Sequence, residues 1–280
     1  MSKRFTYYGS TASAQFIMDL VPNSFFGISL KRLRAAYTGS CIRVRRSNDN
    51  TQQDIGFSGN NLDTAALLSF VGIHNAFIVT WYDQSGNGFN VTNATSGQQP
   101  QIVSSGSLLL DASGNLSARY DGTNDRLLSS TFTLRAQPYT AYGVWQGLNS
   151  TVEYALDGTT TNRSSLGNIG AGNAWRAVSN IAADYSGGTY TPINRASLPI
   201  FQFSTYNGAS SRMNINNFLY VTAINPGTTG IDRVTIGANA NEAGQFWNGF
   251  ISEVVLFDGD KLADLTTIRT NVFSNYTIPL

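Results

Sequence analysis

The residues best suited to chemistry lie in two short polar loops, and each loop directly follows a run of strand-forming residues. The side chains concerned are Asp83, Gln84 and Asn87 after Trp81-Tyr82, and Asp121, Asn124 and Asp125 after Arg119-Tyr120. If both loops meet at one end of a β-sheet, their oxygen atoms could form a polar ligand site or hold calcium, because hard cations prefer clustered oxygen ligands. The alternative, which we favour, is that these are turn residues that satisfy backbone amides.

Rare residue types exclude several other kinds of site. The chain has one cysteine, Cys41, and one histidine, His74. An intrachain disulfide, a Cys-based zinc site and a His-rich metal site are therefore excluded. A Ser–His–Asp or Cys–His mechanism would have to use His74, whose surroundings read as a turn leading into a strand. No cofactor is expected apart from the possible calcium, and the identity of any metal is left open.

Composition limits the class of partner. The chain has 280 residues, a formal net charge of +1 and only 12% charged residues, against about 25% in an average soluble domain. This balance argues against nucleic acid and anionic lipid as partners.

A cluster of basic residues has two interpretations, a phosphate-binding patch or structural pairing with carboxylates. The second is favoured because the planar guanidinium of arginine forms bidentate pairs with carboxylates. The cluster comprises Lys31, Arg32, Arg34, Arg43, Arg45 and Arg46.

The sequence predicts one β-sandwich domain over residues 23–280 with a preceding segment, residues 1–22, that is either an attachment arm or an edge strand. No run approaches the ~18 apolar residues of a membrane span, and the start lacks the apolar core of a signal peptide. We therefore expect synthesis in a cytoplasm without secretion.

The four tryptophans lie in or near predicted strands and are expected mostly in the core; they are Trp81, Trp145, Trp175 and Trp247.

Short runs of β-forming residues separated by Gly, Asn, Asp and Ser predict an all-β fold, a sandwich or jelly roll with a few short helices. The predicted strands are 41–46, 76–82, 116–120, 139–146, 174–179, 200–206, 213–222, 233–237 and 249–257. Helical spacing of apolar residues predicts helices over 25–34, 64–71 and 262–273, the last two preceded by the potential caps Asp63 and Asp260.

The string from Trp81 to Gly88, together with upstream strings around Tyr37-Thr38-Gly39 and Arg45-Arg46-Ser47, resembles the amino-terminal part of the fungal α-L-arabinofuranosidase B catalytic domain. The resemblance implies a concanavalin-like β-sandwich and a retaining glycosidase with two carboxylates. Counted from the weaker later matches, however, Ile181 stands where the family has its nucleophilic Glu, and Asn239 where it has its acid/base Asp. The paired cysteines of the family are absent as well. Asp184 and Glu242 lie close by and could restore the pair if this alignment slips.

The same strings also resemble laminin-G-like sandwich modules of phage structural and tail proteins. Three functions follow as alternatives. The preferred one is a non-enzymatic structural component of a bacteriophage particle, such as a capsid decoration, head fibre or tail protein. It would bind other virion proteins, form a homo-oligomer and reside in the virion. The second is a receptor-recognition module that binds a host surface glycan. The third is an active retaining arabinofuranosidase-type glycosidase.

Overall fold

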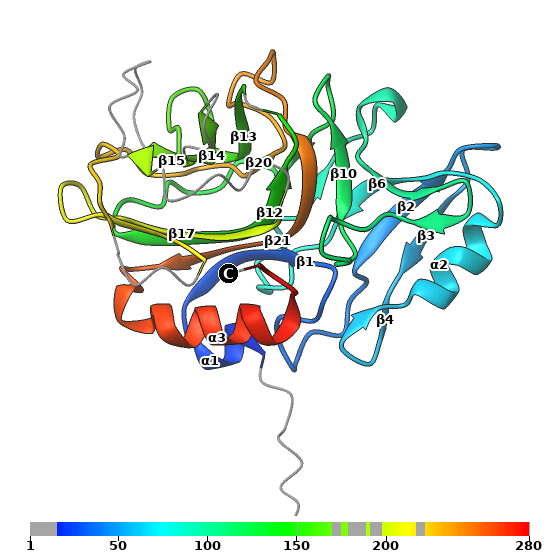
Figure 1. Cartoon of the computed structure of the whole chain (residues 1–280), viewed down its shortest axis with the longest axis horizontal. Coiled ribbons are helices and arrows are strands. Elements are labelled where there is room, and N and C mark those ends of the chain that lie inside the picture. The colour runs from blue at the N-terminus through cyan, green and yellow to red at the C-terminus, as the bar shows by residue number, and fades with distance from the viewer. Residues whose placement is uncertain are drawn as a thin grey trace, which may run out of the picture.

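The computed structural model describes residues 16–149, 151–169, 175–178, 189–190, 198–216 and 222–279. These residues form a large curled antiparallel β-structure with a few short helices, one of them close to the C-terminus (Figure 1). The predicted all-β, sandwich-type fold is confirmed. None of the helices in these ranges combines the length and the apolar run that crossing a lipid bilayer requires.

One sheet runs through the middle of the molecule, and all its strand pairs are antiparallel. Its register places Tyr142 between Val255 and Phe203 on the neighbouring strands. In spatial order the sheet consists of β1 (Ser24–Ser29), β21 (Asn248–Asp258), β12 (Tyr139–Gly147), β17 (Ile200–Tyr206), β18 (Arg212–Ile215) and β19 (Thr222–Ala223).

A second layer lies above this sheet in Figure 1 and completes the sandwich. Buried residues of the two layers, among them Trp145 and Leu256 below and Leu156 and Ile236 above, belong to one hydrophobic core. The strands of the second layer are β13 (Val152–Asp157), β14 (Ser165–Ile169), β15 (Trp175–Val178), β16 (Thr189–Tyr190), β20 (Thr235–Ile236) and β11 (Leu127–Leu128).

A smaller lobe extends the sandwich on the right of Figure 1. Strand β10 joins the two parts, because it pairs with the start of β21 on one side and with β8 on the other. The lobe contains β2 (Ile42–Arg46), β3 (Gln52–Ile55), β4 (Phe57–Ser58), β5 (Asn61–Leu62), α2 (Thr64–Val71), β6 (Ala76–Trp81), β7 (Val91–Thr92), the 3₁₀ turn η1 (Ser96–Gln98), β8 (Gln101–Ser104), β9 (Ser107–Leu108) and β10 (Ala118–Asp121).

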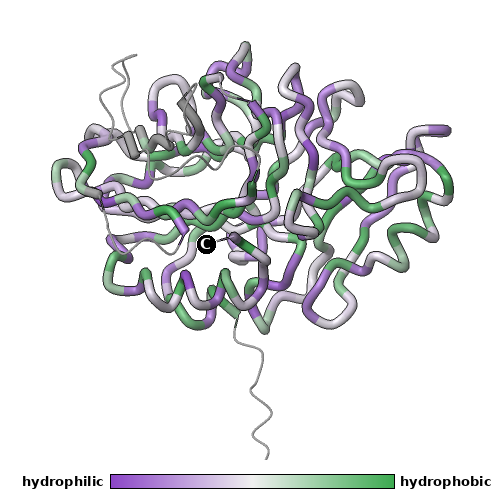
Figure 2. Tube along the Cα trace, viewed as in Figure 1, coloured by the Kyte–Doolittle hydropathy of each residue, from purple (hydrophilic) through white to green (hydrophobic). Residues whose placement is uncertain are grey.

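The outer face of the central sheet is covered by helices α1 (Ile17–Leu20) and α3 (Leu265–Asn275), the latter preceded by the 3₁₀ turn η2 (Leu262–Asp264). Successive side chains of a strand point to opposite faces. Tyr142, Val144 and Phe203 therefore pack against Ile268 and Val272 in a second hydrophobic cluster. Figure 2 shows hydrophobic and hydrophilic residues alternating along α3, as expected for a helix with one buried side.

Most predicted elements are present, with two clear exceptions. The strand predicted over 213–222 is wrong, because β18 ends at Ile215 and β19 pairs antiparallel with it, with Thr222 opposite Met213. Helix α2 occupies Thr64–Val71 as predicted, and Asp63 caps it by accepting a hydrogen bond from Ala66 N at 2.9 Å. The predicted helix over 25–34 is wrong, because Ser24–Ser29 is strand β1, buried along its whole length. A strand covered on both faces needs a continuous apolar run, and such a run also satisfies helical spacing when judged by sequence alone.

Candidate functional site

The first predicted loop holds β1 in place. Asp83 is 3% exposed, and its carboxylate accepts hydrogen bonds from Gly27 N, Ser85 N, Ser85 Oγ and Phe89 N at 2.7–3.1 Å. Gln84, also buried, accepts from Leu33 N and donates to the carbonyls of Ser29 and Lys31. Asn87 Nδ2 donates to the carbonyl of Phe25 at 3.0 Å. These contacts attach the loop to residues 25–33. The polar groups of Asp83, Gln84 and Asn87 that make them are therefore used within the protein.

The second predicted loop connects β10 to β11 and closes on itself. Asp121 Oδ1 accepts hydrogen bonds from the backbone N–H groups of Thr123, Asn124 and Asp125 at 2.8, 3.2 and 3.4 Å. In return, Asp125 Oδ2 accepts from Asp121 N at 3.0 Å. Gly122 has a φ of +78° and lies so close to Asn248 that a Cβ there would be 2.6 Å from the Asn248 Cβ. The loop is thereby fixed against the start of β21.

This loop forms one wall of a pocket of about 430 Å³ between β10, β8 and η1. Both carboxyl groups, Asp121 and Asp125, line it. The other lining residues carry amide, hydroxyl and guanidinium groups together with one aromatic ring; they are Phe77, Ser96, Gly97, Gln99, Gln101 and Arg119. The pocket therefore combines two acids with several polar groups that can bind a polyhydroxylated ligand.

Two of the lining side chains, Arg119 and Gln99, are held in place by hydrogen bonds. Arg119 Nη2 donates to Asn248 Oδ1 at 2.7 Å, and its guanidinium lies 5.5 Å from the centre of the Phe250 ring. Gln99 Oε1 accepts a hydrogen bond from Arg45 Nε at 2.8 Å. Because hydrogen bonds fix their orientation, these side chains can act as preformed parts of a binding site.

The surroundings of Asp125 shift the pKa of its carboxyl group. Burial raises the pKa of Asp125 to about 7, and the negative charge of Asp121 contributes to the increase. The Asp125 carboxyl therefore holds a proton over much of the acidic and neutral pH range, next to the negative charge of Asp121. A carboxyl group that stays protonated towards neutral pH is suited to act as a proton donor.

A different loop, residues 237–247, packs directly beside Asp125. Gly237 has a φ of +84°, and a Cβ at this position would lie 2.4 Å from the Tyr120 ring and 3.1 Å from the Asp125 carbonyl oxygen. Glu242 forms ion pairs with Arg126 at 3.4 Å and with Arg233 at 2.9 Å. Its carboxylate is thus held between two guanidinium groups, close to the segment that carries Asp125.

Asn239, which the resemblance places at the family's acid/base position, lies in this same loop. Its Nδ2 donates to Gln245 Oε1 at 3.1 Å, whereas its Oδ1 is buried with no hydrogen-bond partner among the described residues. The adjacent Ala240 N donates to Asp157 Oδ2 at 3.0 Å, and Arg163 Nη2 donates to the same oxygen at 2.7 Å. Burial raises the pKa of Asp157, and Arg163 opposes this effect. Ile181 and Asp184 lie outside the described residues.

The structure attaches the two predicted loops to different neighbours. Asp121 and Asp125 line the pocket, while Asp83, Gln84 and Asn87 are bonded to β1 and the segment after it. Asn124 belongs to the second loop, and its Oδ1 is buried without a hydrogen-bond partner in the described part of the chain. Within the described ranges, no group of three or more His, Cys, Asp and Glu side chains could hold a metal ion.

The sequence alone did not identify the polar residues that line the pocket together with the two carboxyl groups, namely Arg119, Gln99 and Gln101. The signal for Arg119 is its place between the buried Ala118 and Tyr120 on β10, where a charged side chain must project to the other face of the strand.

The basic cluster shows carboxylate pairing at two positions, Arg43 with Asp54 at 2.7 Å and Arg46 with Asp49 at 2.6 Å. Trp81, Trp145 and Trp247 are buried. For Trp175 the structure describes the backbone only.

The fold is that of solved arabinofuranosidases. A complex described as arabinofuranosidase with arabinofuranosyl-α-1,2-xylobiose matches with a TM-score of 0.72, and a Glu-to-Gln variant of a GH54 α-L-arabinofuranosidase soaked with 4-nitrophenyl α-L-arabinofuranoside matches with 0.71. Both structures are 15% identical to this protein. Each match covers 94% of the present chain and 65% of the length of the solved arabinofuranosidase. A third, a GH54 enzyme soaked with a cyclic sulfate inhibitor, has a TM-score of 0.66, 16% identity and coverages of 91% and 63%.

The sequence itself matches the family of the α-L-arabinofuranosidase B catalytic domain over residues 28–165, just under half of the chain. The matched segment contains both predicted loops and every residue that lines the pocket of Asp121 and Asp125. No curated protein matches the sequence.

These similarities correct the expected function. The family is that of a catalytic domain and the matching structures are glycosidases, so the predictions of a non-enzymatic phage component, of virion partners and of a virion location are wrong. The similarity to phage and laminin-G-like modules is not found in these comparisons. The match over residues 28–165 outweighs the two short patches around Ile181 and Asn239, on which the non-enzymatic expectation depended.

Proposed function

We propose that this chain is a glycoside hydrolase domain that acts on α-L-arabinofuranosides, with Asp125 as its proton donor. The family match over residues 28–165 and the arabinofuranosidase fold support the reaction class. The observation that carries the assignment of the site is that two carboxyl groups, Asp121 and Asp125, line a polar pocket of about 430 Å³ and that the pKa of Asp125 is raised to about 7. Glycosidases generally need two carboxyl groups that flank the scissile bond.

The two carboxyl groups take different roles in this proposal. Asp125, whose pKa is raised to about 7, donates its proton to the glycosidic oxygen as the bond to the leaving group breaks. Asp121 carries the negative charge that faces the developing oxocarbenium ion. The pair also explains how a chain with Ile181 and Asn239 at the family-aligned positions can still supply two acids to one pocket, since isoleucine and an amide can do neither task.

The other walls of the pocket suit a small sugar. Gln101 and Ser96 offer amide and hydroxyl groups to the sugar hydroxyls, while Phe77 offers an apolar surface to the C–H face of the ring. Arg119 lies near both acids, and burial lowers the pKa of its guanidinium while the charges of Asp121 and Asp125 oppose this effect. We assign Arg119 a positioning role, because its hydrogen bond to Asn248 keeps it fixed in the wall.

The proposal is tested by release of arabinose from arabinofuranosyl-α-1,2-xylobiose. We expect turnover by the parent chain and a loss of about 10²–10⁴-fold in kcat/KM for Asp125→Asn, the usual contribution of general acid catalysis. Asp121→Asn is expected to lose activity to a similar degree. Absence of turnover in a parent chain that melts cooperatively would contradict the proposal.

A matched variant separates loss of chemistry from damage to a turn. Asp111 is also a turn aspartate, and it accepts hydrogen bonds from Ser113 N and Asn115 N at 2.9 Å. Because Asp111 is buried whereas Asp121 is exposed, Asp111→Asn should lower stability at least as much as Asp121→Asn and still keep the parent's activity. If Asp111→Asn lost activity equally, the effect at Asp121 would be due to folding.

A further inference from the structure

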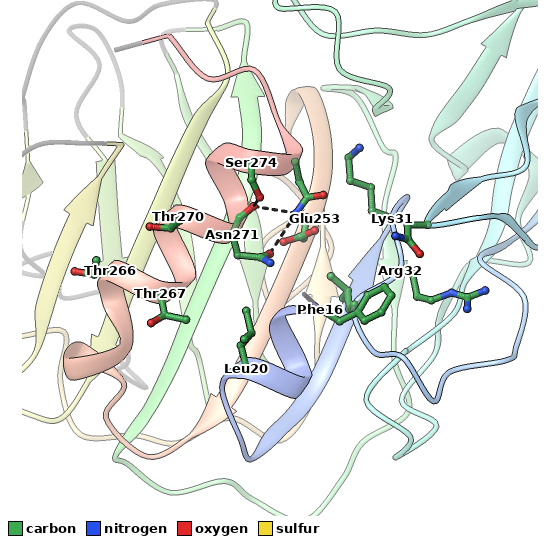
Figure 3. A pocket seen from close by; sticks show the side chains of 13 residues that line it. Phe16, Leu20, Lys31, Arg32, Glu253, Thr266, Thr267, Thr270, Asn271 and Ser274 are labelled. Atoms are coloured by element: carbon green, nitrogen blue, oxygen red, sulfur yellow. Dashed lines mark hydrogen bonds between the residues drawn. The ribbon is translucent and has the colours of Figure 1, made fainter. Parts of the chain in front are cut away.

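A second pocket, of about 540 Å³, lies on the opposite side of the central sheet from the second layer, between α3, α1 and the segment that follows β1. Figure 3 shows one side of it formed by α3, with Thr266, Thr267, Thr270, Asn271 and Ser274, and the other side by Phe16, Lys31 and Arg32. Glu253, on strand β21, lies between the two sides. None of these residues lines the pocket of Asp121 and Asp125.

The charged groups around this pocket already have partners within the protein. The Glu253 carboxyl accepts hydrogen bonds from the hydroxyls of Tyr142, Ser29 and Tyr276 at 2.7, 2.8 and 2.9 Å. Lys31 Nζ donates to Asn61 Oδ1 at 2.9 Å and lies 5.3 Å from the centre of the Tyr276 ring. A charged ligand is therefore not needed to balance either group.

Arg32 is also directed elsewhere. Its side chain extends away from Glu253 and α3 in Figure 3, and its guanidinium carbon lies 5.3 Å from the centre of the Phe57 ring. The pocket thus lacks the convergent guanidinium and ammonium groups with which proteins bind carboxylates or phosphates.

On the α3 side the groups that remain free are neutral; the Arg32 Nε, also without a partner in the described part of the chain, is buried. The hydroxyls of Thr266 and Thr267, on one turn of α3, and of Thr270, on the next, make no hydrogen bond within the described part of the chain. On the other side of the pocket, the half-buried Phe16 and Leu20 supply an apolar surface (Figure 3). A row of free hydroxyls opposite an apolar surface matches the two kinds of surface on a sugar ring, its hydroxyls and its C–H face.

We propose that the pocket between α3 and residues 16–33 is a second binding site, which takes a neutral saccharide unit. It is separate from the pocket of Asp121 and Asp125, and does not depend on the hydrolytic activity proposed for that pocket. Its volume of about 540 Å³ is within the range of small-molecule sites.

The test measures binding to the full chain that carries Asp125→Asn, so that hydrolysis does not consume the probe. Saturation-transfer NMR and calorimetric titration with arabinotriose, xylotriose and maltotriose should detect binding of at least one of these neutral probes. In the same background, Thr267→Val with Thr270→Val removes two hydroxyls at nearly constant volume and should raise the Kd about tenfold, as expected for two lost hydrogen bonds. Binding that persists unchanged in this variant overturns the proposal.

Two controls complete the test. Thr131→Val, at an exposed threonine outside the pocket, should leave the Kd unchanged. Trigalacturonate, a charged probe, should bind more weakly than the neutral one; tighter binding that is lost in Lys31→Met would show an anion site and overturn the assignment. Absence of binding by all three neutral probes at 10 mM, on the order of the weakest specific affinities, also overturns it. Since binding is measured without turnover, failure here leaves the proposed hydrolase function to be judged by its own assay.

Discussion

Asp121 and Asp125 hold each other in place through their backbones. The Asp121 N–H donates to Asp125 Oδ2 at 3.0 Å, and the Asp125 N–H donates to Asp121 Oδ1 at 3.4 Å. The same short loop therefore fixes both acids and places one negative charge close to the other carboxyl group. This closeness, added to burial, raises the pKa of Asp125 to about 7.

The first prediction concerns the pH dependence of activity. A general acid must be protonated, so kcat/KM for arabinofuranoside hydrolysis should decrease as the pH rises through about 7. The measurement is a pH–rate profile of the parent chain between pH 5 and 9, with the folded state verified at each pH. A rate that stays constant across this range would exclude Asp125 as the acid.

The second prediction concerns Asp83. Asp83→Ala leaves the N–H groups of Gly27, Ser85 and Phe89 and the Ser85 hydroxyl without their acceptor, and each such loss costs about 1–3 kcal/mol when buried. We expect a decrease of about 3 kcal/mol or more in the free energy of unfolding, measured with urea. Asp49→Ala, which removes an exposed ion pair with Arg46 and one exposed hydrogen bond from Thr51 N, should have a much smaller effect. Equal effects of the two variants would show that the loop does not hold β1.

The third prediction concerns the start of the described chain. Met18 is 4% exposed and packs against Gly27, where its Cε lies within 1.8 Å of the position that a Cβ would occupy. Met18→Ala should lower the free energy of unfolding by about 2–5 kcal/mol through loss of buried surface and the resulting cavity. Leu134→Ala, at a side chain that is 49% exposed, should cost much less. If Met18→Ala unfolds like the parent, residues 16–22 act as an attachment arm and not as part of the core.

The fourth prediction concerns Glu253 and the pH dependence of stability. Burial raises its pKa above the ordinary 4.5, although the hydroxyls of Tyr142, Ser29 and Tyr276 oppose this effect. The native state therefore binds more protons than the unfolded chain above about pH 4.5, and this group makes stability decrease as the pH rises. Glu253→Gln should flatten the decrease in Tm between pH 5 and 8. An unchanged slope in the variant would show that Glu253 is ionised in both states.

Much of the fold follows from local sequence. Strand β17 coincides with the predicted range 200–206, and α2 coincides with 64–71, because alternation and a capping Asp63 are both local signals. Strand β1 was missed for a non-local reason. Its strand conformation depends on pairing with β21 and on the contact of Asp83 with Gly27, and neither is visible within residues 24–29.

The candidate site was predictable in part. Asp121 and Asp125 are recognisable as acids in a loop after a strand, whereas Gln99 and Gln101 join them only because β8 pairs with β10. The raised pKa of Asp125 also depends on burial, which sequence spacing does not reveal. Ile181 and Asn239 predicted the wrong class of protein, because two residues placed by a short alignment do not define whether the chain holds a pair of acids elsewhere.

The role of Asp125 as proton donor is tested most directly by the leaving group. A 4-nitrophenolate leaves with little help from an acid, whereas a sugar hydroxyl needs a proton. The account predicts that Asp125→Asn loses about 10²–10⁴-fold in kcat/KM on arabinofuranosyl-α-1,2-xylobiose but far less on 4-nitrophenyl α-L-arabinofuranoside. An equal loss on both substrates, or no loss on either, would contradict it.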